Sequence, residues 1–121
     1  MEIREYVTLG GRVPFLEWID KLRDRSARTR IRVQLDRLLT GNFGDHKSLG
    51  HGLHELRIHY GPGYRIYYGL EGQALILLLC GGNKATQQSD IRLAANYWQD
   101  YRRRADEKKP TLSEKPDSSS D

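Results

Sequence analysis

Two arginines stand in the middle of two strand-like runs that flank a glycine–proline–glycine turn. In LHELRIHYGPGYRIYY, residues 53–68, a side-chain period of two places Leu56 and Ile58 on one face and Arg57 on the other. The same period places Arg65 opposite the apolar side chains of the return run. Because a hairpin brings the two apolar faces together, Arg57 and Arg65 are predicted to share the other face. Like charges there repel by up to about 1 kcal/mol, a cost that an anion between them would offset.

A third cation, Lys84, follows the letters CGGN directly after an apolar run. The two glycines let the chain leave the sheet and bring Lys84 near the polar face of the hairpin. Arg57, Arg65 and Lys84 would then surround a phosphate, since charged donors stabilise the charge that develops on a phosphorane. The alternative is that the two arginines form ordinary surface ion pairs, worth about 0 to 1 kcal/mol each. The acids available for such pairs are Glu55, Glu71 and Asp90.

Chemistry at a bound phosphate would also need a base that removes a proton and an acid that donates one. Histidine suits both roles, and the hairpin region contains His46, His51, His54 and His59. Only His59 is predicted on the polar face within the strand, whereas His54 is predicted on the core face. No cysteine and no helical i, i+4 pair of histidines accompanies them, so no metal site is predicted. Tyr67 is predicted on the same face as Arg65, where it would contact RNA.

Charge separates the chain into a body and a tail. Within the 121 residues, residues 1–104 contain 17 basic and 11 acidic side chains, a net charge of +6, and 14 of the basic ones are arginines. Arginine grips phosphate in a fork, so the body favours a nucleic-acid partner. Residues 105–121 contain three lysines, five acids and two prolines, which predicts a disordered polar tail.

Cysteine content and hydropathy indicate where the protein works. The lone Cys80 lies inside the apolar run ALILLLC, which excludes a disulfide framework and favours a reduced, cytoplasmic setting. The charged N-terminus MEIREY is unlike a signal peptide. The longest apolar run has seven residues, too few to span a membrane.

The order of the predicted elements is that of an α+β fold. We expect a small, twisted, mostly antiparallel sheet with two N-terminal helices and a C-terminal helix. A helix begins at Pro14, a second spans 26–40, and the link 41–52 is polar. The run 74–80 shows no alternation, which predicts a central strand that is buried on both faces. The closing helix begins near Thr86 and ends at Arg104.

The second helix has a basic face, formed by Arg28, Arg30, Arg32 and Arg37. Three interpretations of this face are open: it binds nucleic acid, it binds a protein partner, or it is exposed to solvent without a partner. The solvated face is the most common of the three.

Several segments of the chain resemble one protein family. PFLEW, GNFGDHKSLGHGLHELRIHYGPGYRIYYG and LLLCGGNKATQQSDIRLAANYW, in this order and spacing, resemble the HigB-like addiction-module killer proteins of the RelE/ParE toxin superfamily over residues 3–101. The resemblance implies a toxin domain over residues 1–104, paired with a helix-turn-helix antitoxin from the adjacent gene. It implies cleavage of messenger RNA on the ribosome, without a cofactor, and contact with DNA only through the antitoxin. It also assigns Arg57, Arg65 and Lys84 to the functional face.

The sequence departs from the RelE branch at two positions. That branch has a lysine where this chain has Glu55, and a tyrosine early in the last helix, where this chain has Ile91. Glu55 is therefore either a catalytic base or the electrostatic partner of Arg57. Two other functions stay open: a ParE-like gyrase inhibitor with no nuclease activity, and an inactive module that binds nucleic acid or antitoxin.

Overall fold

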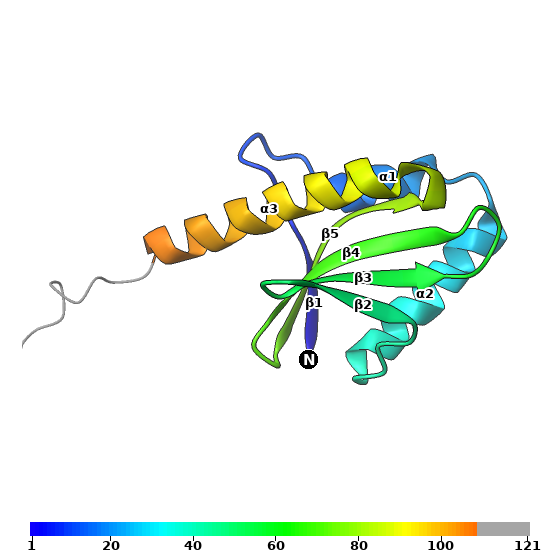
Figure 1. The fold of residues 1–121 in the computed structure, drawn as a ribbon, viewed down its shortest axis with the longest axis horizontal. Helices are drawn as coiled ribbons and strands as arrows, with labels where there is room; N and C mark the ends of the chain where they lie inside the picture. Colours follow the sequence, from blue (N-terminus) through cyan, green and yellow to red (C-terminus); the bar gives the residue numbers. More distant parts are fainter. Residues whose placement is uncertain (109–121) are drawn as a thin grey trace, which may run out of the picture.

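The computed structural model describes residues 1–108, which fold into an α+β domain with three α-helices and one five-stranded sheet (Figure 1). The elements in chain order are β1 (Glu2–Glu5), α1 (Pro14–Lys21), α2 (Arg25–Leu39), β2 (His46–Gly50), β3 (Leu53–Ile58), β4 (Tyr64–Glu71), β5 (Leu75–Asn83), the short 3₁₀ helix η1 (Lys84–Thr86) and α3 (Gln87–Lys108). The α+β class is as predicted. The two earlier helices lie between β1 and β2 rather than at the start of the chain.

The sheet is mixed, with strand order β1-β5-β4-β3-β2. β1 pairs parallel with β5, and the other three pairs of neighbours are antiparallel. The predicted, mostly antiparallel sheet is thus confirmed. The polar link predicted for 41–52 contains a strand, β2, and this part of the prediction was wrong. β2 is an edge strand with exposed His46, Lys47 and Ser48, so it lacks the apolar alternation that identifies a strand.

Short local signals start and stop the helices. Pro14 occupies the first turn of α1, where its missing N–H leaves no helical hydrogen bond unmade. The side chain of Asp24 accepts hydrogen bonds from the backbone N–H groups of Ser26 and Ala27 and so caps α2. Just beyond α2, Gly41 adopts a φ of +85°, a left-handed conformation that terminates helices.

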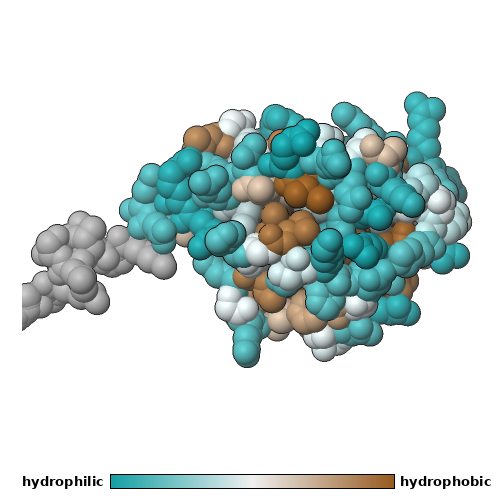
Figure 2. All heavy atoms as spheres, in the orientation of Figure 1, coloured by the Kyte–Doolittle hydropathy of each residue, from teal (hydrophilic) through white to brown (hydrophobic). Residues whose placement is uncertain are grey.

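Each face of the sheet packs against its own helices. α1 and α2 cover the first face through an apolar cluster that includes Phe15, Ile31 and Leu56. α3 packs on the second face through Ala94 and Trp98. The predicted double burial of β5 is confirmed over 76–80, where every side chain is buried. The face shown in Figure 2 is mostly hydrophilic, with an apolar area near its centre.

α3 is longer than the sequence predicts. It continues to Lys108, so the boundary at Arg104 is four residues too early, and residues 105–108 are helical rather than disordered. The remainder of the predicted tail, 109–121, lies outside the described residues. None of the helices described over 1–108 has the length and apolar content needed to cross a bilayer.

Replacing Gly69 by alanine is expected to destabilise the domain by about 1–3 kcal/mol, the usual cost of overpacking a core. A Cβ at this position would lie 2.2 Å from two ring carbons of Trp98. That ring cannot easily move, because it is buried and donates a hydrogen bond to the His51 carbonyl. Urea unfolding measures the effect, with Gly10→Ala as the control, since a Cβ there meets nothing closer than 3.9 Å. Equal stability of the two variants would contradict this packing.

Candidate functional site

The hairpin register places Arg57 and Arg65 directly opposite each other on neighbouring strands β3 and β4. Gly82 follows opposite Arg65 on β5. The predicted pairing of the two arginines on one face is therefore confirmed. Their side chains are 31% and 12% exposed, so both guanidinium groups are largely sheltered from water.

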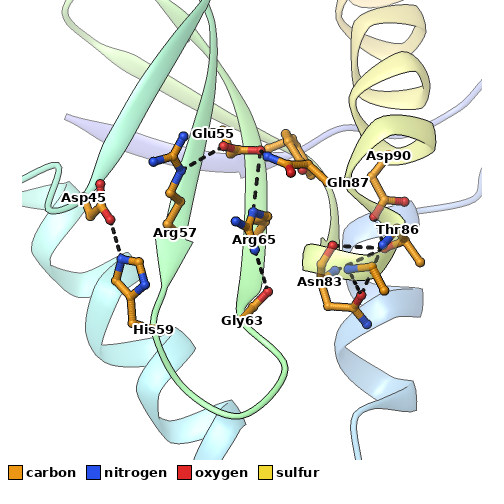
Figure 3. A network of polar contacts seen from close by, with 12 residues as sticks. Asp45, Glu55, Arg57, His59, Gly63, Arg65, Asn83, Thr86, Gln87 and Asp90 are labelled. Carbon is orange, nitrogen blue, oxygen red and sulfur yellow. Dashed lines mark hydrogen bonds and ion pairs between the residues drawn. The ribbon is translucent and has the colours of Figure 1, made fainter.

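A buried carboxylate, that of Glu55, lies between the two arginines and α3 (Figure 3). Its side chain is 0% exposed. Arg57 Nε donates to Oε1 at 3.1 Å, while the Tyr67 hydroxyl and Gln87 Nε2 each donate to Oε2 at 2.9 Å. Arg65 Nε lies 3.8 Å from the same Oε2. Glu55 is thus the electrostatic partner of both arginines, and a role as a solvent-accessible catalytic base is not compatible with its burial.

These contacts determine the ionisation of the group. Burial raises the pKa of the Glu55 carboxyl, but the hydrogen bonds from Gln87, Arg57 and Tyr67 together outweigh burial, and the pKa falls below its ordinary value of 4.5. Burial and the bond to Glu55 raise the pKa of the Tyr67 phenol. At neutral pH an ionised carboxylate therefore accepts from a protonated phenol.

Tyr67 is not a surface residue. Its side chain is fully buried in the cluster between the sheet and α3, so the predicted contact of this ring with RNA was wrong. The alternation along β4 correctly places Tyr67 on the face of Arg65. It does not reveal that α3, which begins 20 residues later, covers that part of the face.

Arg65 and Lys84 both approach the hairpin turn at Gly63. Arg65 Nη1 donates to the Gly63 carbonyl at 2.9 Å, and a Cβ on Gly63 would lie 3.3 Å from that nitrogen and 3.7 Å from the Lys84 Cβ. Gly63 also has a φ of +80°, which favours glycine. The predicted approach of Lys84 to the hairpin is therefore confirmed. Lys84 is exposed, and within residues 1–108 it forms no hydrogen bond or ion pair.

The 3₁₀ helix η1 fixes the position of Lys84. The Asn83 side chain accepts hydrogen bonds from the backbone N–H groups of Ala85 and Thr86, and the Thr86 hydroxyl accepts from the Asn83 N–H. That hydroxyl also contacts the Asp90 carboxylate, which occupies the space over Gly82. Lys84 thus leaves β5 through a capped turn rather than a loose loop.

His59 lies just beyond the end of β3, next to Arg57. β3 ends at Ile58, so His59 is in the turn rather than within the strand. Its side chain is 74% exposed, and its Nε2 contacts the Asp45 carboxylate. Figure 3 shows this pair beside Arg57, on the side away from Arg65. The hydrogen bond to His59 lowers the pKa of the Asp45 carboxyl.

The other three histidines lie on the core face, in the edge strand and in a turn, away from the polar face that carries Arg57 and Arg65. His54 stacks on Tyr68 with ring centroids 5.3 Å apart, on the core face as predicted, and burial lowers its pKa. His46 lies in the edge strand β2, and His51 forms the turn that follows with a φ of +56°. No group of three potential ligand side chains that could hold a metal ion occurs among the described residues.

Sequence reasoning missed two further members of this region. Lys47 on β2 is directly opposite Glu55 and is exposed, and its strand gave no signal in the sequence. Gln87, the first residue of α3, reaches the Glu55 carboxylate from 32 positions away. The cations of the region are Lys47, Arg57, Arg65 and Lys84, and the acids are Asp45, Glu55 and Asp90. The excess of one positive charge suits an anionic ligand.

Comparison with known proteins found an uncharacterized relative. No family model matches the sequence. The chain is 46% identical over 80 residues to an uncharacterized protein of Haemophilus influenzae, a match that covers 66% of this chain and 81% of that protein.

Replacing Glu55 by glutamine is expected to lower the free energy of unfolding at pH 7 by about 3–5 kcal/mol, because it leaves two partly buried arginines without their counter-charge. A carboxyl whose folded pKa is depressed stabilises the fold above its unfolded pKa and loses that contribution as the pH falls through the folded value. The difference between parent and variant should therefore shrink below pH 4.5. Urea unfolding from pH 7 to pH 3 measures both effects.

Glu71→Gln is the matched control for this charge change. Glu71 is exposed and accepts a hydrogen bond from the Tyr101 hydroxyl, so its loss should cost no more than about 1 kcal/mol. A Glu55→Gln variant as stable as this control at pH 7 would refute the role given to the buried carboxylate.

Proposed function

The chain belongs to the same family as the Haemophilus influenzae protein, and we propose that it is the toxin of a type II toxin–antitoxin pair that cleaves messenger RNA on the ribosome. The domain over residues 1–104, extended by the last turn of α3, would form the toxin. The motifs that resemble HigB-like killer proteins of the RelE/ParE superfamily support this assignment. The cationic site on the sheet, formed by Arg57, Arg65 and Lys84, supports it as well.

The observation that carries the proposal is the directly opposite position of Arg57 and Arg65 on two strands, next to Lys84, which has no ion-pair partner among residues 1–108. Like charges directly opposite in a sheet are unfavourable, and one carboxylate, that of Glu55, neutralises only one of them. A phosphodiester would supply the second negative charge. Charge-assisted hydrogen bonds from guanidinium groups to phosphate are among the strongest in proteins.

The chemistry proposed is an intramolecular transfer at phosphorus. The 2′-oxygen attacks the adjacent phosphorus, the bond to the 5′-oxygen breaks, and the products are a 2′,3′-cyclic phosphate and a 5′-hydroxyl. Arg57, Arg65 and Lys84 would stabilise the phosphorane. His59 is an exposed titratable group beside Arg57, and we assign it to take the proton from the 2′-hydroxyl and to return one to the departing 5′-oxygen, because Glu55 is inaccessible.

The partners follow from the same proposal. A helix-turn-helix antitoxin encoded by the adjacent gene would neutralise the toxin, and any contact with DNA would be through the antitoxin. The toxin would act in the cytoplasm on ribosomes and messenger RNA.

One observation favours a second candidate. Glu55 already pairs with Arg57 and approaches Arg65, which is the arrangement expected if the module binds nucleic acid or antitoxin without cleaving. Primer extension on a reporter messenger RNA distinguishes the two, because only a ribosome-dependent nuclease leaves cuts in phase with codons. No described feature specifically favours a gyrase inhibitor, which would also leave no such cuts.

Lys84→Ala and Arg65→Ala are each expected to slow cleavage on purified ribosomes by about 100- to 1,000-fold, the usual cost of one lost donor at a developing negative charge. Lys84→Ala should leave the melting temperature unchanged, because that side chain is exposed and unpaired within residues 1–108. Lys21→Ala, on α1, removes the same charge away from the site and should cleave like the parent. Cleavage by Arg65→Ala or Lys84→Ala at the parental rate would overturn the proposed site.

A further inference from the structure

A groove of about 510 Å³ lies between α2 and the end of β3, next to the cationic site. Its charged and titratable lining consists of Arg30, Arg37, Asp45, Arg57 and His59. Arg57 also bonds to Glu55, so the groove and the cationic site share this residue.

Helix geometry selects which arginines of α2 reach the groove. Arg30, Gln34 and Arg37 recur at helical spacing and lie on one stripe of the helix. Arg28 and Arg32 belong to the same helix but do not line the groove. The basic face read from the sequence is therefore divided, and only part of it is directed toward the hairpin.

Two contacts shape the groove. The Arg30 guanidinium lies 4.3 Å from the centroid of the Tyr60 ring, a cation–π contact that holds it beside the hairpin turn. Gly44, with a φ of +58°, passes close to α2, and a Cβ there would lie 3.1 Å from Gln34 Oε1. The chain before β2 thus forms a wall of the groove.

The groove has an excess of positive charge. Asp45 is the one acid in its lining, and its carboxylate already contacts His59. Neither Arg30 nor Arg37 forms an ion pair in the part of the chain that the structure describes. Three arginines thus line the groove beside one carboxylate, and one of the three, Arg57, also pairs with Glu55.

We propose that this groove binds the phosphates of the RNA strand that flank the cleaved bond. The inference rests on the proposed nuclease function and extends it by a second phosphate subsite. An RNA strand fits better than an acidic peptide because Arg57 joins the groove to the site of the scissile phosphate, so that successive phosphates meet successive arginines. Arginine also matches phosphate with a bidentate fork.

The test measures RNA binding without cleavage. The probe is a fluorescein-labelled 12-nucleotide 2′-O-methyl oligouridylate, which lacks the attacking hydroxyl, and anisotropy gives its Kd from 50 to 300 mM salt. For single strands each phosphate contact contributes about 0.7 to the slope of log K against log salt. Arg37→Ala should lower the slope by about 0.7 and weaken binding about 5- to 10-fold at 50 mM salt, and Arg30→Ala/Arg37→Ala should double the change in slope.

Arg32→Ala is the matched control, since it removes an exposed arginine of the same helix outside the groove. Its slope should equal that of the parent. Equal losses for Arg32→Ala and Arg37→Ala, or no binding by the parent at 50 mM salt, would overturn the proposal. A 12-residue polyglutamate that binds the groove more tightly than the RNA would assign it to a protein partner instead.

The RNA-binding test of the groove and the cleavage test of the proposed function can fail independently of each other. If RNA binding depends on the groove but the protein makes no cuts on ribosomes, the groove proposal stands and the nuclease proposal is refuted. If the parent cleaves normally but Arg37→Ala leaves RNA binding unchanged, the nuclease proposal stands and the groove proposal is refuted.

Discussion

The ionised carboxylate of Glu55 is buried at the point where β3, β4 and α3 meet, and the candidate site depends on it. A charge in this position must be fully hydrogen-bonded, because an unpaired buried ion costs several kcal/mol. Arg57, Tyr67 and Gln87 satisfy it from the three elements. The same contacts that meet this requirement hold Arg57 beside Arg65 and tie the start of α3 to the sheet.

This arrangement explains how two like charges occupy directly opposite positions in a folded sheet. The carboxylate compensates one guanidinium, and positive charge remains. Burial also lowers the local dielectric, so that each remaining positive charge would act more strongly on an anion than it would in water. The stability of this part of the sheet and the positive charge of the candidate site thus rest on one group of side chains, with Lys84 placed at its solvent side by the capped turn of η1.

Local patterns in the sequence predicted much of this architecture. The hairpin register follows from the period-two alternation around one short turn, and the central position of β5 follows from its lack of alternation. These signals are contained within a few neighbouring residues. β2 was missed because an edge strand with exposed side chains has no such pattern. The burial of Tyr67 depends on α3, which packs on the sheet from a distant part of the chain.

The same division applies to the site. Arg57, Arg65 and Lys84 could be predicted because strand alternation and a glycine exit determine their positions. For Glu55 the sequence left two roles open, a catalytic base or the partner of Arg57, and the contact with Gln87 could not be predicted because it spans 32 positions. The most direct test of the account is a pH titration of the Glu55 carboxyl carbon by ¹³C NMR. The account predicts a midpoint below the ordinary value of 4.5, and a midpoint at or above 4.5 would contradict it.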